Sequence, residues 1–292
     1  MKKLAAMSIM AVMVLGMAAC GSKEEAPAEE NTAEEETAEE APAEEAEASE
    51  EERTTFTVGF DAEYPPYGYM DENGEYTGFD LELAQAVCDL KGWELVKTPI
   101  NWDSKDMELN SGSIDCIWNG FTMNGREDDY TWSKPYVNNS QVVVTAEDSG
   151  IEVLSDLAGK IVGVQTASSA LDALNSDEHK DLTASFAALQ EFGDYNNAFV
   201  ELKAGAIDAI AMDIGVAYYQ INSRENSGDY KILDEEISSE QYGIGFKKGN
   251  TELRDKVQAT LDEMAADGTI EEIAEKYADF GVPGSLCIGK DE

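Results

Sequence analysis

The chain has 292 residues, with 61 acidic and 20 basic side chains, so its formal net charge at pH 7 is −41. Nucleic acids and anionic lipids bind basic surfaces, and this charge argues against both as partners. The length is enough for about two domains with buried cores.

Residues 1–19 (MKKLAAMSIMAVMVLGMAA) have the pattern of a secretory signal peptide, with two lysines, a short apolar run and small residues before Cys20. The run is too short, and wrongly flanked, for a membrane-spanning helix. The ending MAACGS resembles a bacterial lipobox, which implies that Cys20 becomes the lipidated N-terminus of the mature protein. An ordinary cleavage site beside an incidental cysteine is the alternative. We therefore expect a protein at the extracytoplasmic face of the cell membrane, in contact with the membrane through its lipid anchor only.

Residues 21–53 consist mostly of Glu, Ala, Pro, Ser and Thr, with fifteen glutamates against Lys23 and Arg53. Such a segment buries too little apolar surface to offset the entropy lost on ordering it. Residues 20–53 are therefore predicted to be a lipidated cysteine followed by a disordered acidic tether.

The predicted folded part begins with residues 55–60 (TFTVGF), whose alternating pattern predicts a strand that ends at Asp61. A loop rich in Pro, Tyr and Gly follows. Asp80 is then predicted to cap a helix that ends at Gly92 and has one apolar face, formed by Leu83, Ala84, Val87 and Leu90. A short strand over residues 93–97 leads to Trp102.

Residues 108–126 (ELNSGSIDCIWNGFTMNGR) contain a pattern that recurs in residues 201–213 (ELKAGAIDAIAMD). In each copy a helix is predicted to end at a glycine, Gly112 or Gly205, because glycine tolerates the left-handed conformation of a helix C-cap. An apolar run then carries the chain back as a strand. The two copies predict two similar α/β lobes.

The connections between the lobes are predicted from two further segments. An unbroken apolar run at residues 142–144 is expected to cross into the second lobe, and the chain is expected to cross back near Gln241. Two amphipathic helices then close the first lobe, and the terminal segment GVPGSLCIGKDE is expected to be a tail. The predicted organisation is 54–142 and 241–292 for lobe 1 and 143–240 for lobe 2.

The candidate binding site lies at the two repeat copies, because open α/β sheets bind ligands at the carboxyl ends of their strands. The first copy places Asn119, Gly120, Thr122 and Arg126 there, and the second places Asp213. A guanidinium matches a carboxylate with two parallel donors, and an aspartate can receive an ammonium group. A cation and an anion across a gap suit a zwitterion. The alternatives are a surface ion pair with an adjacent acidic residue for Arg126 and a helix cap for Asp213.

Further candidates surround this point. Ser168 and Ser169 begin a predicted helix whose free N–H groups suit an anion, with simple capping as the alternative, above all for Ser168. Asp61, Tyr64 and Trp102 are expected to line the side-chain end of the site, where aromatic rings pack on aliphatic stems or cations. Core packing is the alternative for Trp102. No catalytic residue, metal or other cofactor is expected.

Besides Cys20, the chain contains Cys88, Cys116 and Cys287. This odd number, without a CxxC spacing, indicates neither a zinc site nor a disulfide framework. At most one pair can form.

Several motifs, taken in their order along the chain, resemble one family. They are VGFDAEYPPYGY, GEYTGFDLELAQAV, SGSIDCIWNGFTMNGRE, LAGKIVGVQTASS, LKAGAIDAIAMD and the closing ELRDKVQATLDEMAADGTIEEIAEKY. Over essentially all of residues 54–283, the chain resembles the extracytoplasmic solute-binding proteins of amino-acid ABC importers, in the group for polar amino acids. The resemblance implies a type II periplasmic-binding-protein-like fold, with two α/β lobes that are joined by two crossing strands and close on the ligand.

The resemblance also implies roles for single residues. Arg126 matches the arginine that binds the α-carboxylate of the ligand, Asp213 the aspartate that binds the α-ammonium, and Ser169 a residue that touches the carboxylate. The turn between Thr122 and Arg126 is one residue shorter than in many members, so it must be tighter. The family's residues that contact the side chain of the ligand correspond to Asp61, Tyr64 and Trp102.

The leading hypothesis is a lipid-anchored, monomeric receptor that binds a free amino acid and delivers it to an ABC permease and its ATPase. Asp61 with two aromatic rings favours lysine, arginine, histidine or glutamine, and small polar ligands and cystine stay open. The main alternative is an exported dehydratase on the same fold that acts on a cyclic prephenate-like acid, with Asp61 or Glu63 as general acid. A sensory ectodomain is a third hypothesis, which a second membrane segment would indicate.

Overall fold

The computed structural model describes residues 53–290. The predicted signal peptide, the lipidation site Cys20 and the acidic segment up to residue 52 lie outside the described residues. Those that are described belong to a single compact unit. None of their helices is both long enough and apolar enough to span a bilayer.

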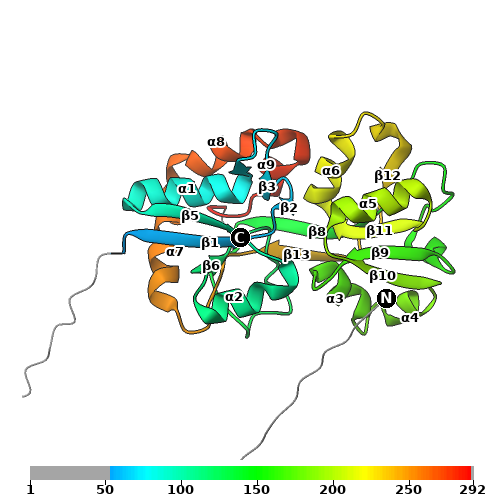
Figure 1. Ribbon diagram of the computed structural model, residues 1–292, viewed down its shortest axis with the longest axis horizontal. Coiled ribbons are helices and arrows are strands. Elements are labelled where there is room, and N and C mark those ends of the chain that lie inside the picture. The colour runs from blue at the N-terminus through cyan, green and yellow to red at the C-terminus, as the bar shows by residue number, and fades with distance from the viewer. Residues whose placement is uncertain (1–52, 291–292) are drawn as a thin grey trace, which may run out of the picture. The chain divides into compact units, whose positions relative to one another are not determined.

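The first lobe is built on a five-stranded sheet with the strand order β5-β1-β6-β14-β7 (Figure 1). β1 (Thr55–Phe60) has the predicted range and is parallel to β5 (Glu94–Pro99) and β6 (Cys116–Ile117). β14 (Gly245–Phe246) is antiparallel to β6 and to β7 (Thr131–Trp132). Strands from the beginning and the end of the folded unit therefore share one sheet.

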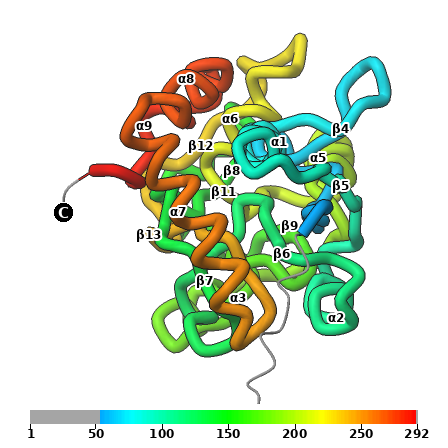
Figure 2. Tube along the Cα trace, turned by 90° about the vertical axis from the view of Figure 1, so that its left-hand side faces the viewer, coloured from blue at the N-terminus to red at the C-terminus, as the bar shows by residue number. Residues whose placement is uncertain are grey.

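Helices from both ends of the unit accompany this sheet. Figure 2 shows α7, α8 and α9 on one side of the lobe and α2 on the other. A small antiparallel sheet of β2, β3 and β4 extends the loop after β1. The bounds of these elements are Phe79–Lys91 for α1, Lys105–Ser111 for α2, Thr251–Asp267 for α7, Thr269–Glu275 for α8, Val282–Ser285 for α9, Glu63–Tyr64 for β2, Gly68–Met70 for β3 and Tyr76–Thr77 for β4, with 3-10 turns at Trp102–Ser104 and Ala278–Phe280.

The second lobe is built on a sheet in the order β10-β9-β11-β8-β12, with β13 also paired to β8. β9 is parallel to β10 and β11, whereas β8 is antiparallel to β11, β12 and β13. The bounds are Val137–Ala146 for β8, Ile161–Gln165 for β9, Ala188–Phe192 for β10, Ala209–Asp213 for β11, Tyr230–Ile232 for β12, Ser238–Tyr242 for β13, Ser169–Asn175 for α3, Lys180–Ala184 for α4, Tyr195–Ala204 for α5 and Ile214–Asn222 for α6, with 3-10 turns at Leu154–Leu157 and Ser227–Asp229.

β8 and β13 run between the two lobes as an antiparallel pair (Figure 1). The first half of β8, up to Gln141, pairs with β13, and its second half pairs with β11. The prediction of two α/β lobes joined by two crossing strands is therefore confirmed. The predicted lobe boundaries, 142/143 and 240/241, fall inside these strands and stay a prediction.

The repeated motif folds as its glycines predict. Gly112 follows α2 with a φ of 82°, and Gly205 follows α5 with a φ of 70°, both in the left-handed C-cap conformation. After each cap the chain returns as a strand, β6 in the first lobe and β11 in the second. The two lobes thus bring equivalent strand ends toward the region between them.

The predicted cap at Asp80 is wrong. The cap position is Gly78, where the φ is 130° and an added Cβ would clash with the carbonyl oxygen of Tyr67. Asp80 is fully buried in the first turn of α1 and accepts hydrogen bonds from the backbone N–H of Gly120 (2.6 Å) and the hydroxyl of Tyr136 (2.8 Å). Burial raises the pKa of Asp80 to about 7, although both hydrogen bonds oppose the change.

Two smaller predictions also need correction. Leu90 lies in the last turn of α1 and is 55% exposed, so the buried stripe of this helix ends with Val87 and Cys88. The terminal segment is not a free tail over the described residues. Val282 and Leu286 are buried, and Leu286 forms a bridge with Val137 at the start of β8, because these apolar side chains pack into the core.

Candidate functional site

A cavity between the two lobes is lined by nine of the ten predicted site residues. The first lobe contributes the end of β2, the 3-10 turn at Trp102–Ser104 and the segment after β6, and the second contributes the end of β9, the start of α3 and the end of β11. Their role in ligand binding stays a prediction. The lining residues are Tyr64, Trp102, Asn119, Gly120, Thr122, Arg126, Ser168, Ser169 and Asp213, together with Gln165.

Arg126 makes one part of the cavity wall cationic. Its Nη2 donates to Oδ2 of Asp172 at 2.7 Å, and its Nη1 donates to the carbonyl of Thr122 at 3.4 Å. Asp172 comes from α3 in the opposite lobe and is 66% exposed, whereas the Arg126 side chain is 12% exposed. The arginine is therefore not paired with its acidic sequence neighbours. Because a guanidinium carries five N–H donors, it keeps donors for a ligand.

Lys105 is a buried cation beside the cavity. Its Nζ donates to the carbonyls of Trp102 and Ala167, both at 3.4 Å, and lies 5.1 Å from the centroid of the Trp102 ring. Burial lowers the pKa of Lys105, and so does the neighbouring Arg126. Ala167 belongs to the second lobe, so this lysine, like Arg126, joins the two lobes.

The predicted hydroxyls meet across the cavity. Thr122 Oγ1 in the first lobe lies 3.1 Å from Ser169 Oγ in the second. Ser168 is the N-cap of α3, and its hydroxyl accepts from the N–H of Leu171 at 3.2 Å, so the capping role holds for this residue. Ser169 points its hydroxyl at the site, where it also accepts from Nε2 of Gln141 at 2.9 Å.

Asp213 is 1% exposed at the end of β11 and makes no capping hydrogen bond to α6. Its Oδ1 accepts from Nδ2 of Asn139 and Nε2 of Gln141, both at 2.8 Å, and from the hydroxyl of Tyr242. Burial raises the pKa of Asp213, and these hydrogen bonds partly offset the change. The carboxylate therefore faces the site, and the helix-cap alternative does not hold.

The sequence did not point to the acidic partner of Asp213, which is Glu240. This glutamate lies on β13, is 7% exposed, and its Oε1 accepts from Thr122 Oγ1 at 2.8 Å. Asn139 and Gln141 also donate to it, both at 2.7 Å. The sequence of the crossing strand β8 does indicate Asn139 and Gln141, because these two polar side chains lie two positions apart beside an apolar run and therefore share one face of the strand.

The segment after β6 is fixed by buried hydrogen bonds. Asn119 Oδ1 accepts from the N–H of Asp61 at 2.9 Å, and the N–H of Gly120 is taken by Asp80. At Gly120 the φ is +54°, and an added Cβ would lie 3.1 to 3.2 Å from the rings of Tyr242, Tyr64 and Tyr67. Gly120 therefore shapes the wall and has no free N–H for a ligand.

Asp61 is the one predicted residue that does not line this cavity. It lines an adjoining hollow that shares Trp102 with the cavity. Its Oδ2 accepts from Gln165 Nε2 at 2.7 Å across the lobes, and its Oδ1 accepts from the N–H of Glu63 at 2.9 Å. Burial raises the pKa of Asp61 to about 6, although both hydrogen bonds oppose the change.

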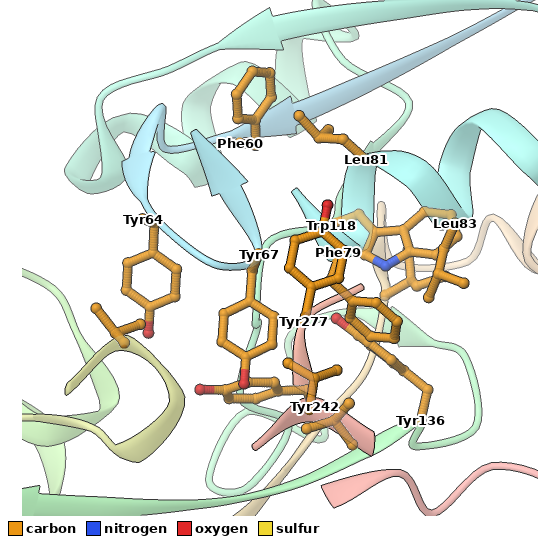
Figure 3. Packing of buried hydrophobic residues seen from close by; sticks show 14 of the residues in the cluster. Phe60, Tyr64, Tyr67, Phe79, Leu81, Leu83, Trp118, Tyr136, Tyr242 and Tyr277 are labelled. Atoms are coloured by element: carbon orange, nitrogen blue, oxygen red, sulfur yellow. The ribbon is translucent and has the colours of Figure 1, made fainter. Parts of the chain in front are cut away.

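Aromatic rings form the remaining wall. The rings of Tyr64 and Trp102 are almost parallel, at 6°, with their centroids 6.5 Å apart. Figure 3 shows Tyr64 and Tyr67 side by side, with Tyr242 next to Tyr67, and the Tyr67 and Tyr242 rings meet edge to face at 5.2 Å. Trp102 also packs against Phe121, so core packing and site lining both apply to it. Such rings suit the apolar stem or flat polar group of a ligand side chain.

The lobes are closed over the cavity. Its volume is about 10 Å³, room for about one water molecule. The side chains that form hydrogen bonds between the lobes, such as Arg126 with Asp172 and Gln165 with Asp61, occupy the space between them. An amino acid can enter only when the lobes separate. No group of His, Cys, Asp and Glu suited to a metal ion occurs among residues 53–290.

Two crossing strands, two α/β lobes and a polar cavity between them define a hinged binding protein. Residues 56–281 match the bacterial extracellular solute-binding proteins, family 3, and the chain belongs to this family.

The relatives are amino-acid-binding proteins. The chain is 30% identical over 230 residues to the L-cystine-binding protein TcyJ of Escherichia coli K12, covering 78% of this chain and 84% of the relative. A substrate-binding protein of an ABC uptake transporter from Streptococcus pneumoniae, solved with bound histidine, is 32% identical with a TM-score of 0.74, covering 76% of this chain and 92% of the other. The ancestral amino-acid-binding protein AncCDT-1, described as a precursor of cyclohexadienyl dehydratase, is 30% identical with a TM-score of 0.68, covering 76% and 95%.

Proposed function

We propose that this protein is the amino-acid-binding receptor of an ABC importer, which captures a free polar or cationic amino acid between its lobes and delivers it to the permease. The observation that carries the proposal is the polarity of the cavity, which has Arg126 in the wall of one lobe and the buried Asp213 in the wall of the other. An α-amino acid carries a carboxylate and an ammonium group on one carbon. It can therefore join the two lobes and favour their closure.

The side-chain end of the ligand is assigned to the space beside Tyr64, Trp102 and Asp61. Parallel rings accept an aliphatic stem, a guanidinium, an imidazole or an amide between or beside them. Asp61 then accepts a hydrogen bond from a distal N–H once Gln165 moves away. This arrangement favours arginine, lysine, histidine or glutamine over acidic amino acids.

The anchoring, the assembly and the domain limits complete the proposal. Cys20 carries the lipid, the acidic segment up to residue 53 gives reach from the membrane, and residues 54–292 act as a monomer. The permease and its ATPase are the protein partners. The lobes are residues 54–142 with 241–292 and residues 143–240.

An enzymatic function on the same fold is the alternative. It is favoured by the Asp61 carboxyl, whose pKa of about 6 suits a general acid near neutral pH, and by the likeness to a dehydratase precursor. The test is incubation with a prephenate-like cyclic acid. Product formation that Asp61→Asn abolishes would favour the enzyme, and no product over hours would exclude it.

The receptor function is tested with a thermal-shift screen of residues 54–292, stripped of ligand by unfolding and refolding, against the common amino acids and a few cyclic acids. A ligand that binds only the folded form at 100 times its Kd stabilises it by about 2.7 kcal/mol. We expect one or a few cationic or amide-bearing amino acids to raise the melting temperature. A screen in which no amino acid does so would refute the proposal.

A further inference from the structure

The site contains two buried carboxylates that share the same donors. Asn139 Nδ2 lies 2.8 Å from Asp213 Oδ1 and 2.7 Å from Glu240 Oε1, so these two oxygens are no more than 5.5 Å apart. Gln141 Nε2 joins the same two oxygens at 2.8 and 2.7 Å. Asp213 is 1% exposed and Glu240 is 7% exposed, so water screens the repulsion between them poorly.

Among the described residues, no cation neutralises this pair. Arg126, which lines the same cavity, donates to Asp172 and to a carbonyl, and Lys105 donates to two carbonyls. The titratable groups that face the pair are tyrosines, and burial raises the pKa of each, so that they are neutral at neutral pH. They are Tyr64 from β2, Tyr67 from the loop after β2, Tyr195 from α5 and Tyr242 from β13.

Two adjacent carboxylates without a counter-ion cannot both be ionised at low cost. Burial raises the pKa of Glu240 to about 7, and the charge of Asp213 adds to the effect. Burial raises the pKa of Asp213 as well. Such a pair titrates as a unit in which the first carboxyl ionises readily and the second holds its proton to higher pH.

The amides that bridge the pair have spare acceptors. Oδ1 of Asn139 and Oε1 of Gln141 are buried and have no hydrogen-bond partner, while both residues are at least nine-tenths buried. A buried acceptor without a donor costs free energy. An ammonium group brings three N–H donors and a positive charge, which satisfies carboxylates and amide oxygens together.

We propose that Glu240 and Asp213 share one proton in the absence of ligand and release it when the ammonium group of an amino acid takes its place. This inference rests on the proposed function, since it concerns the same cavity. The entering R–NH₃⁺ keeps its own protons, the protonated carboxyl of the pair becomes a carboxylate, and the displaced proton passes to solvent. Glu240 is then a positioning residue that makes the ammonium site doubly anionic.

The proposal predicts proton-linked binding. At pH 7 the protein releases on the order of half to one proton per ligand, and below the titration of the pair the affinity falls about tenfold for each pH unit. Because the charge to be matched is larger than one, the site favours ligands with a full ammonium over N-acetylated analogues.

The experiment is isothermal titration with L-arginine, or with L-glutamine if arginine does not bind, at pH 7 in two buffers of different ionisation enthalpy. The difference in heat gives the protons released. Glu240→Gln keeps the size and an acceptor for Thr122 but removes the charge, so release should drop to near zero. Glu236→Gln, at an exposed acid four residues earlier, is the control and should behave as the wild type.

Two outcomes overturn the proposal: a wild type that releases no proton, or a Glu240→Gln variant that releases as many as the wild type. If Glu240→Gln does not fold, Asp213→Asn leaves a single carboxylate, and release must again vanish for whatever binding survives. A wild type that releases no proton overturns the proposal even without either variant, whereas release by the wild type needs a variant to separate the pair from Asp61, whose pKa is also raised.

An infrared pH titration of the ligand-free protein separates this inference from the proposed function. A protonated-carboxyl band at pH 7 that is stronger in the wild type than in Glu240→Gln supports the shared proton, whether or not an amino acid binds, because Asp80 contributes equally to both proteins. A wild type without such a band refutes it. Failure of every amino acid to bind, with the band present, refutes the receptor function alone.

Discussion

Replacement of Arg126 by alanine tests the site most directly. In a closed cavity the variant leaves the α-carboxylate of the ligand buried without its counter-ion, which costs on the order of 3 to 5 kcal/mol. At about 1.4 kcal/mol for each factor of ten, the Kd should rise roughly 100- to 4,000-fold. The folded state should lose little, because Asp172, the ion-pair partner, is 66% exposed and such pairs contribute about 0 to 1 kcal/mol.

Isothermal titration with the ligand found in the screen measures the affinity, and thermal unfolding without ligand measures the stability. Asp172→Ala is the matched control, since it breaks the same ion pair and leaves the guanidinium in place. Its affinity should stay within a few-fold of the wild type. Retention of the wild-type affinity by Arg126→Ala, within about threefold, would refute the assignment of the carboxylate to this residue.

Three further predictions concern the scaffold. Because the pKa of Asp80 is raised from 3.8 to about 7, its contribution to stability is largest below pH 3.8 and is lost as the pH rises to 7. Asp80→Asn should therefore flatten the pH dependence of the unfolding free energy between these two values, as measured with denaturant. An unchanged slope would contradict this prediction. Gly120→Ala should lower the free energy of unfolding in urea by about 1 to 3 kcal/mol, because its φ is +54° and three rings crowd the new Cβ. Gly74→Ala is the control, since its φ is +83° but its surroundings are open, and it should lower this free energy by about 1 kcal/mol or less. Equal losses in the two variants would refute the crowding argument. Cys88 and Cys116 are free and buried, and burial raises the pKa of both thiols, so a thiol reagent should modify them only after unfolding, and rapid modification of the native protein would argue against this packing.

The sequence predicted the parts of the site that local patterns control. Gly112 and Gly205 mark helix ends in both lobes, and the strands that follow must end at equivalent places. Asp213 could therefore be placed at the carboxyl end of a strand and Arg126 beyond the end of another, and both could be assigned to one cavity from the sequence alone. The alternating pattern of residues 55–60 predicted the bounds of β1 in the same way.

The parts that it missed depend on pairing between distant segments. Glu240 reaches the site only because β13 pairs with β8 about one hundred residues earlier in the chain, and no local pattern distinguishes it from the exposed acids around it. Asp80 looked like a helix cap because a carboxylate often precedes an apolar face. Its hydrogen-bond partners, Gly120 and Tyr136, are 40 and 56 residues away, so no local sequence pattern could predict the interaction.

The closed cavity explains how a strong polar site can still release its ligand. Each ligand group predicted to bind meets a contact that the protein makes by itself. The carboxylate shares the Arg126 guanidinium with Asp172, the ammonium replaces a proton on the Asp213 and Glu240 pair, and the side chain replaces Gln165 at Asp61. Binding therefore exchanges contacts and adds few new ones, so the net free energy is smaller than the sum of the contacts. A receptor that hands its ligand to a permease needs this balance, because its lobes must open again at the membrane. Substitutions that remove a competing contact without touching the ligand, such as Asp172→Ala, should consequently leave the affinity equal or raise it, and never reduce it severely.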